Sequence, residues 1–170
     1  MKLFLTPIAI VSYLLLTGCG GAEVELRVID YTPTLHQFDV VDSYGVDTAK
    51  PGDLPLAINP YINNGLFDVS WQVNSLDDYR INIRINDYPS VSSSELIYSE
   101  VCGVGRACDQ GGGVICQYTS DFTVSCNNSS RIPNIDYLFK SVPQKLYLIM
   151  QVCDINSSNC EYQDYPVLME

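Results

Sequence analysis

The sequence is poor in several residues that common protein functions require. It has 9 lysine and arginine residues against 20 aspartate and glutamate residues, and His36 is its only histidine. A chain with few cations and a formal net charge of −11 is poorly suited to nucleic acid or to anionic lipid headgroups. Any Ser-His-Asp or Cys-His catalytic group would have to use His36. These shortages argue against nucleic-acid binding and leave few residues for catalysis.

The N-terminal apolar run, Leu3 to Leu16, is 14 residues long, whereas a membrane span needs about 20. Lys2 precedes the run, as in a signal peptide. The run ends in Leu16-Thr17-Gly18-Cys19, which resembles the lipobox of bacterial lipoproteins: an aliphatic residue and two small residues before a cysteine. The resemblance implies that residues 1–18 are a cleaved signal peptide and that Cys19 is lipidated and acylated. An ordinary secretory signal with an incidental cysteine is the alternative.

The residue after Cys19 indicates in which membrane a lipidated chain would be held. An aspartate at this position favours the inner membrane in Gram-negative lipoproteins, and here it is Gly20. The resemblance therefore implies an outer-membrane lipoprotein, held firmly because several acyl chains bind a membrane better than one. The mature chain would keep 8 basic and 20 acidic residues, a net charge of −12. Its length suits a tether, residues 19–53, followed by one domain, residues 54–170.

The sequence also lacks a C-x-x-C motif, although it has seven cysteines. The missing spacing argues against a zinc ribbon and against thioredoxin-like chemistry. Without Cys19 an even number of cysteines remains, which indicates disulfides in an exported protein. Neighbour pairing (102–108, 116–126 and 153–160) is the first expectation, and 102–126 around 108–116 is the alternative. The six are Cys102, Cys108, Cys116, Cys126, Cys153 and Cys160.

Apolar residues recur with a period of two, which predicts strands rather than helices. Residues 67–73 and 79–86 alternate most regularly. Residues 145–153 are almost continuously apolar, as expected of a central strand buried on both faces. We predict an all-β sandwich of antiparallel sheets held by about three disulfides. Further strands are expected at 96–101, 114–118, 122–126 and 162–169, with a candidate strand at 24–29 in the tether and a short helix within 135–141.

Two patches resemble fibronectin type III and related immunoglobulin-like domains. Val69-Ser70-Trp71 and, after seven residues, Tyr79-Arg80-Ile81 are similar to strands B and C, and residues 147–152 with the following hairpin are similar to strands F and G. The resemblance implies a core position for Trp71 between the sheets and a place for Tyr147 near the start of strand F. Residues 102–140 depart from the family pattern. The scaffold hosts many functions, so no catalytic residue is implied.

Acidic residues supply the candidates for chemistry. Asp77 and Asp78 share a tight turn, where neighbouring side chains project apart, so they do not suit the facing carboxylates of a hydrolase. Calcium would need a ligand spacing that neither available group has. We therefore expect no catalytic residue, no metal and no cofactor. The two groups weighed for calcium are Asp39, Asp42 and Asp47, and then Asp154, Asn156 and Asn159.

Glycine-rich and tyrosine-rich stretches complete the candidates. Residues 102–108 and 111–113 superficially resemble phosphate-binding loops, but no helix is predicted to follow them. Five Asp-Tyr dipeptides recur, at 30–31, 78–79, 87–88, 136–137 and 164–165. Tyrosine beside polar groups is typical both of recognition surfaces for proteins or sugars and of ordinary strand edges.

The sequence thus favours a non-enzymatic lipoprotein whose loops, especially the cysteine-bounded residues 102–126, bind a protein or glycan partner. An inhibitor of a secreted cationic enzyme such as lysozyme is the alternative, because the acidic charge would attract a basic target. A hydrolase that uses two carboxylates is the least favoured function.

Overall fold

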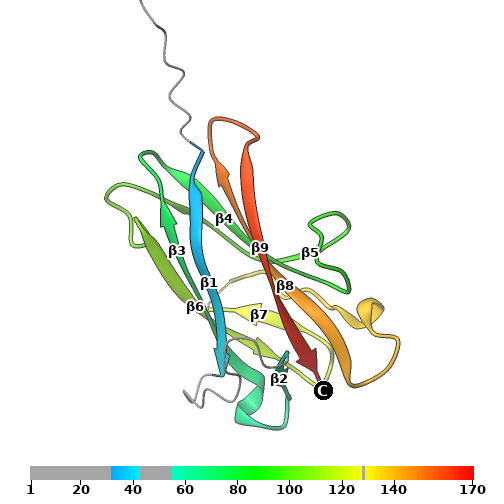
Figure 1. Ribbon diagram of the computed structural model, residues 1–170. Helices are drawn as coiled ribbons and strands as arrows, with labels where there is room; N and C mark the ends of the chain where they lie inside the picture. Colours follow the sequence, from blue (N-terminus) through cyan, green and yellow to red (C-terminus); the bar gives the residue numbers. More distant parts are fainter. Residues whose placement is uncertain (1–31, 43–54, 128) are drawn as a thin grey trace, which may run out of the picture. The chain divides into compact units, whose positions relative to one another are not determined.

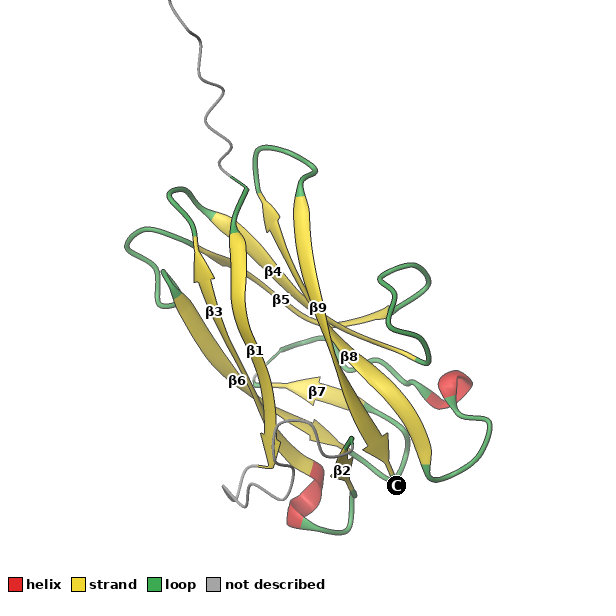
Figure 2. Ribbon diagram, viewed as in Figure 1, coloured by secondary structure: helices red, strands yellow, loops and turns green. Residues whose placement is uncertain are grey.

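The computed structural model describes residues 32–42, 55–127 and 129–170, which form two β-sheets (Figures 1 and 2). One sheet has four strands in the order β1-β3-β6-β7, and the other has five in the order β2-β9-β8-β4-β5. The four are β1 (Thr34–Asp42), β3 (Leu66–Asn74), β6 (Gly111–Tyr118) and β7 (Val124–Cys126). The five are β2 (Leu56–Ile58), β4 (Tyr79–Asn86), β5 (Glu95–Cys102), β8 (Gln144–Asp154) and β9 (Cys160–Met169).

The predicted all-β sandwich is confirmed. Every second residue of β3 and β4 is buried: Phe67, Val69, Trp71 and Val73 in β3, and Tyr79, Ile81, Ile83 and Ile85 in β4. This alternation sends one face of each strand into a shared apolar core and the other face outward. Paired strands are antiparallel except β2, which runs parallel to β9. Among the described residues, no helix is long and apolar enough to cross a membrane.

Three details differ from the sequence predictions. In β8 only Ile149 is buried on the second face, while Tyr147 and Gln151 remain partly exposed, so this strand is not covered on both sides throughout. The expected helix within 135–141 is a single 3-10 turn, η3 (Asp136–Leu138). The first sheet includes β1, from a segment assigned to the tether. The candidate strand at 24–29 lies outside the described residues.

The strand order can be compared with the immunoglobulin-like scaffold. The segments resembling strands C, F and G are β4, β8 and β9, and these are neighbours in one sheet, as in that scaffold. Trp71, expected in the core, is buried between the sheets. Tyr147 lies near the start of β8, on its outer face. After residue 102, β6 pairs with β3, and β7 returns from β6 as a hairpin.

Three disulfides join neighbouring cysteines: Cys102–Cys108, Cys116–Cys126 and Cys153–Cys160. The neighbour pairing is therefore confirmed and the nested alternative is wrong. Two of the bonds connect residues that are already partners on adjacent strands, in the β6–β7 and β8–β9 pairs. The third joins the end of β5 to the loop before β6.

Candidate functional site

Three loops gather at one end of the sandwich, and together we call them the loop pole. They are residues 75–78 between β3 and β4, residues 103–110 between β5 and β6, and residues 155–159 between β8 and β9. Strand register brings them to the same end, because Tyr79 is the partner of both Cys102 and Asp154. The chain also enters the sandwich here, since Thr34 is the partner of Asn74 (Figure 1).

Each loop exposes one large aliphatic side chain. The exposed fraction is 70% for Leu76, 69% for Val104 and 41% for Ile155. Single exposed aliphatic residues are common on protein surfaces, but three on adjacent loops at one pole are typical of a contact surface. The sequence analysis did not identify these residues. The available signal was an aliphatic residue in the middle of a turn that is otherwise polar.

The first two loops are joined by an ion pair and by close backbone packing. Arg106 donates to Asp78 Oδ2 through Nη2 at 2.9 Å and through Nε at 3.3 Å. Gly103 lies directly against Asp78: a Cβ at this glycine would be 2.3 Å from Oδ1 and 2.6 Å from the Asp78 Cα. The hydrogen bonds to Asp78 raise the pKa of Arg106 above its already high value. The two loops thus form one connected surface.

A buried aromatic pair supports loop 103–110 from below. The Tyr79 hydroxyl donates to the Cys108 carbonyl oxygen at 2.7 Å, and the Tyr79 side chain is fully buried. Burial, with the nearby Asp109 charge, raises the pKa of Tyr79 to about 12. The nearby Trp71 indole N–H opposes this rise and lowers the pKa of Tyr79, although the indole N–H and the Tyr79 hydroxyl are not in hydrogen-bonding geometry. Together with the Cys102–Cys108 disulfide, these contacts fix the base of the loop.

The third loop is closed by its own disulfide and by local hydrogen bonds. The Cys153–Cys160 bond joins the strand ends. Above it, Asp154 Oδ1 accepts from the Asn156 N–H at 2.9 Å, and the Asp154 N–H donates to the Asn159 carbonyl oxygen at 3.1 Å. Such bracing lowers the conformational entropy that a loop loses when it binds a partner.

The loop pole is acidic. Arg106 is the only cation in the three loop sequences, and Asp78 neutralises it. Asp77 is exposed, while Asp109 and Asp154 are partly exposed. Three carboxylates therefore lie in or next to the loops that expose the three aliphatic side chains, which suits a partner whose apolar patch has basic groups at its rim.

The structure divides the cysteine-bounded region 102–126 that the sequence favoured as a binding element. Only residues 103–110 join the loop pole, because β6 then runs to the opposite end, where residues 119–123 turn into β7. The glycine run has a packing role: a Cβ at Gly112 would be 2.7 Å from Cζ2 of Trp71 and 3.2 Å from Cβ of Cys108. The small Gly112 therefore leaves room for the Trp71 ring beside the Cys102–Cys108 disulfide. The glycine run belongs to strand β6 and not to the start of a helix, so it does not have the arrangement of a phosphate-binding loop.

The residues weighed for calcium are not brought together in the described part of the chain. Asp39 and Asp42 are three positions apart in β1 and therefore point to opposite faces of the strand. Asp39 accepts a hydrogen bond from Gln37, and Asp42 accepts two from Asn63 Nδ2, at 2.8 and 3.0 Å. Asp47 lies outside the described residues. In the second group, Asp154 caps its own turn through Asn156.

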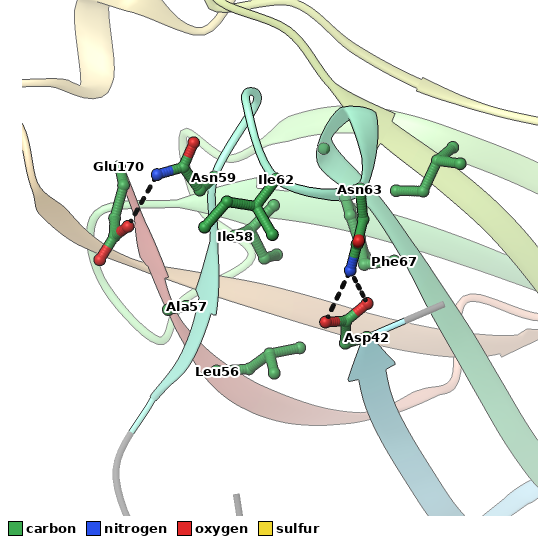
Figure 3. Close-up of a pocket in the computed structure, with 11 residues that line it drawn as sticks. Asp42, Leu56, Ala57, Ile58, Asn59, Ile62, Asn63, Phe67 and Glu170 are labelled. Carbon is green, nitrogen blue, oxygen red and sulfur yellow. Dashed lines mark hydrogen bonds between the residues drawn. The ribbon is translucent and has the colours of Figure 1, made fainter. Parts of the chain in front are cut away.

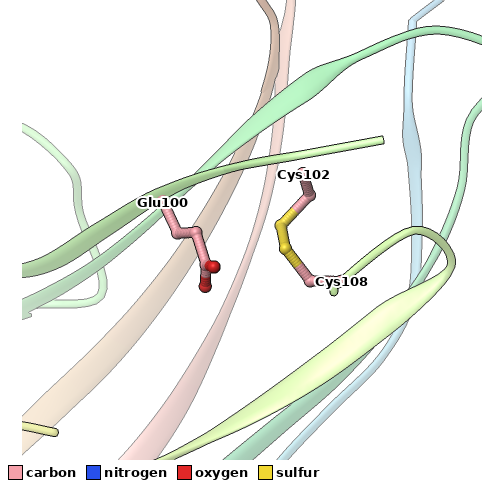
Figure 4. Close-up of side chains that lie close together, drawn as sticks. All are labelled: Glu100, Cys102 and Cys108. Carbon is pink, nitrogen blue, oxygen red and sulfur yellow. A yellow bond between two sulfur atoms is a disulfide. The ribbon is translucent and has the colours of Figure 1, made fainter. Parts of the chain in front are cut away.

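The candidates for acid–base catalysis are also separated. His36 is exposed in β1, where the register with β3 shifts. Asp78 pairs with Arg106, whereas Asp77 is exposed and its backbone N–H approaches the Ser75 hydroxyl. One cluster within the described ranges has metal-ligand composition: Glu100, Cys102 and Cys108 (Figure 4). Its two sulfur atoms are bonded to each other, and metal binding requires thiolates.

A small cleft of about 60 Å³ lies at the end opposite the loop pole (Figure 3). Asp42 and Glu170 contribute carboxylates to it, and both accept hydrogen bonds from amide groups, Glu170 from Asn59 Nδ2 at 3.0 Å. The volume holds about two water molecules, far below the several hundred Å³ of a small-molecule site. We therefore place the candidate functional site at the loop pole.

No protein-family model and no curated protein sequence matches the chain.

Proposed function

We propose that the protein is a lipid-anchored, non-enzymatic β-sandwich of the bacterial outer membrane that binds a protein partner through its loop pole. The observation that carries this proposal is the set of three adjacent loops, each with an exposed aliphatic residue and two closed by disulfides. An apolar centre with a polar rim on a rigid support is the usual composition of a protein-binding surface.

The lipobox at residues 16–19 supports the anchoring part of the proposal. Thr34, where β1 begins at the loop pole, is fifteen positions after Cys19. A chain of this length spans at most about 50 Å. A lipid on Cys19 would therefore keep the loop pole close to the membrane surface, where a partner anchored in the same membrane meets it at high effective concentration.

Site-specific photo-crosslinking in the native host tests this proposal. A photoreactive residue at position 76, 104 or 155 of the full-length protein is expected to capture the same partner. The matched control is position 61, because Tyr61 is also exposed but lies at the opposite end. A partner captured only from position 61, or measurable catalytic turnover by the purified protein, would count against the proposal.

The acidic rim favours a second candidate, an inhibitor of a cationic secreted enzyme such as lysozyme. The carboxylates of Asp77, Asp109 and Asp154, which no cation in the three loops neutralises, would attract a basic target, and added salt would screen that attraction. Titration of lysozyme activity with the purified protein tests this function directly. Inhibition that weakens in Asp77→Asn and in high salt is expected, whereas unchanged lysozyme activity at micromolar protein would eliminate the candidate.

A further inference from the structure

Two tyrosines far from the loop pole expose their rings on segments that are joined by side-chain contacts. Tyr88 lies in the β4–β5 loop and Tyr137 in η3, and their exposed fractions are 61% and 60%. Lys140 connects the two segments: its Nζ is 5.7 Å from the centroid of the Tyr88 ring and 3.4 Å from Asp87 Oδ2. The Tyr137 hydroxyl donates to Glu95 Oε2 at 3.2 Å. We call these five residues the tyrosine surface.

The support of the tyrosine surface is rigid. The side chain of Asn86, which is buried, donates to the carbonyl oxygens of Ser90 and Ser92 at 2.9 and 3.1 Å, and its own Oδ1 accepts from the Asp87 N–H. These bonds fix the loop that contains Tyr88. A rigid loop needs little reorganisation to bind a ligand.

Contacts with the core also fix the second ring. Asn134 Oδ1 accepts from the Asp136 N–H at 2.9 Å, at the start of η3. Leu138 is buried in the core, and Phe139 packs against it. Tyr137 lies between Asp136 and Leu138 and is therefore directed outward on a fixed turn.

We propose that the tyrosine surface binds an uncharged oligosaccharide. A sugar ring has an apolar C–H face and a rim of hydroxyl groups. The exposed tyrosine rings offer flat apolar faces, Asp87 and Glu95 offer acceptors for hydroxyl protons, and Lys140 offers a donor. With Asp136, the region has three carboxylates and one ammonium group, so anionic sugars would be repelled.

The composition of this surface favours a sugar over a protein. Protein interfaces have apolar centres depleted of lysine, glutamate and aspartate. Here the charged pair Lys140–Asp87 lies beside the Tyr88 ring, and the Lys140 side chain is 73% exposed. The rings are also too exposed for a small-molecule pocket, which encloses most of its ligand. An extended polysaccharide lying across the rings fits both observations.

Calorimetry with two defined sugars tests the inference. The full-length protein, solubilised in a detergent without a sugar headgroup, is titrated with cellohexaose and with chitohexaose, and with polygalacturonate as an anionic probe. We expect at least one uncharged hexasaccharide to bind and the anionic polymer not to bind. Tyr88→Ala and Tyr137→Ala should each weaken binding about tenfold, whereas Tyr88→Phe should retain it because the ring face remains.

The matched control is Tyr162→Ala, since Tyr162 is equally exposed but lies in β9. Binding that is absent in the wild-type protein, or that falls equally in the Tyr162 variant, overturns the inference. Self-association or protein binding that depends on Tyr88 without any binding of sugar would assign the surface to a protein partner and also overturn it. The loop pole is a separate site, so crosslinking from positions 76, 104 and 155 tests the proposed function independently of the sugar titrations.

Discussion

At the scale of single residues, Tyr79 links the core to the candidate functional site. Its ring is in the apolar core and its hydroxyl holds the backbone of loop 103–110. A buried carbonyl that loses its donor costs more free energy than the hydrogen bond itself contributes. The loop conformation therefore depends on this phenol group as well as on the Cys102–Cys108 disulfide.

Substitution Tyr79→Phe tests this dependence. It removes the hydroxyl and leaves the Cys108 carbonyl without this donor, so we expect the free energy of unfolding to fall by about 1–3 kcal/mol. Urea denaturation of the oxidised protein at neutral pH measures the change. Tyr162→Phe, at an exposed position, should change stability by less than about 0.5 kcal/mol. Equal stability of the two variants would show that the hydroxyl does not support the loop.

The same residue predicts a loss of stability in strong alkali. Burial raises the pKa of Tyr79, and also that of Tyr98, from the ordinary 10.0 to about 12. Below pH 10 both the folded and the unfolded chain keep the phenol protons, so these groups add no pH dependence. Between about pH 10 and about pH 12 the unfolded chain loses them first, and stability falls as pH rises.

Urea denaturation as a function of pH measures this effect. The stability difference between wild type and Tyr79→Phe should shrink as pH rises from about 10 to about 12, because the variant lacks the Tyr79 phenol. Parallel stability curves for wild type and variant over this range would contradict the assignment to Tyr79.

At the scale of elements, strand register decides which loops meet. Loops 75–78 and 103–110 are separated in sequence, yet Gly103 touches Asp78 and Arg106 pairs with it. Gly103 also has a φ of +132°, which other residues rarely adopt. The contact between the two loops therefore requires glycine at this position.

Two alanine substitutions in the same loop separate packing from backbone strain. Gly103→Ala should lower the free energy of unfolding by about 2 kcal/mol or more, since it adds a collision with Asp78 to the backbone strain. Gly105→Ala is the matched control: its φ is +77° and its surroundings are open, so only about 1 kcal/mol of strain is expected. Equal losses in urea denaturation would mean that the contact with Asp78 adds nothing.

Element positions were largely predictable, because the period-two pattern of β3 and β4 is a local property. The burial of β8 was overestimated, because an apolar sequence does not reveal that Tyr147 stays partly exposed among the described residues. The loop pole was predicted only in part. Sequence indicated loop 103–110 through its cysteines, but Leu76 and Ile155 join it through pairing between distant strands.

At the scale of the whole molecule, the proposed lipid attachment would decide where both proposed surfaces operate. The acyl chains would contribute most of the affinity for the membrane, because about 0.8 kcal/mol is gained for each buried CH₂. The acidic domain itself has little attraction for anionic lipids.

Substitution of Cys19 tests the anchor in the native host. Wild-type protein is expected in the membrane fraction, and Cys19→Ser is expected to lose the lipid and to appear in the soluble fraction of the envelope. Gly20→Ser, one residue later, should remain in membranes. Mass spectrometry of the N-terminal peptide supplies the direct measurement. An unmodified Cys19 in the wild-type protein would refute lipid anchoring.

The sequence by itself determined most of the strands, although not β1 or β2, and it determined the oxidised state of the six later cysteines and the burial of Trp71, because these follow from local periodicity and from the number of cysteines. The tertiary structure decided which loops share a pole, why Gly112 must be small and how Tyr88 and Tyr137 come to share a surface. The physical reason is that these relations join residues distant in sequence. They are created by strand pairing and core packing, which no local pattern of side chains specifies.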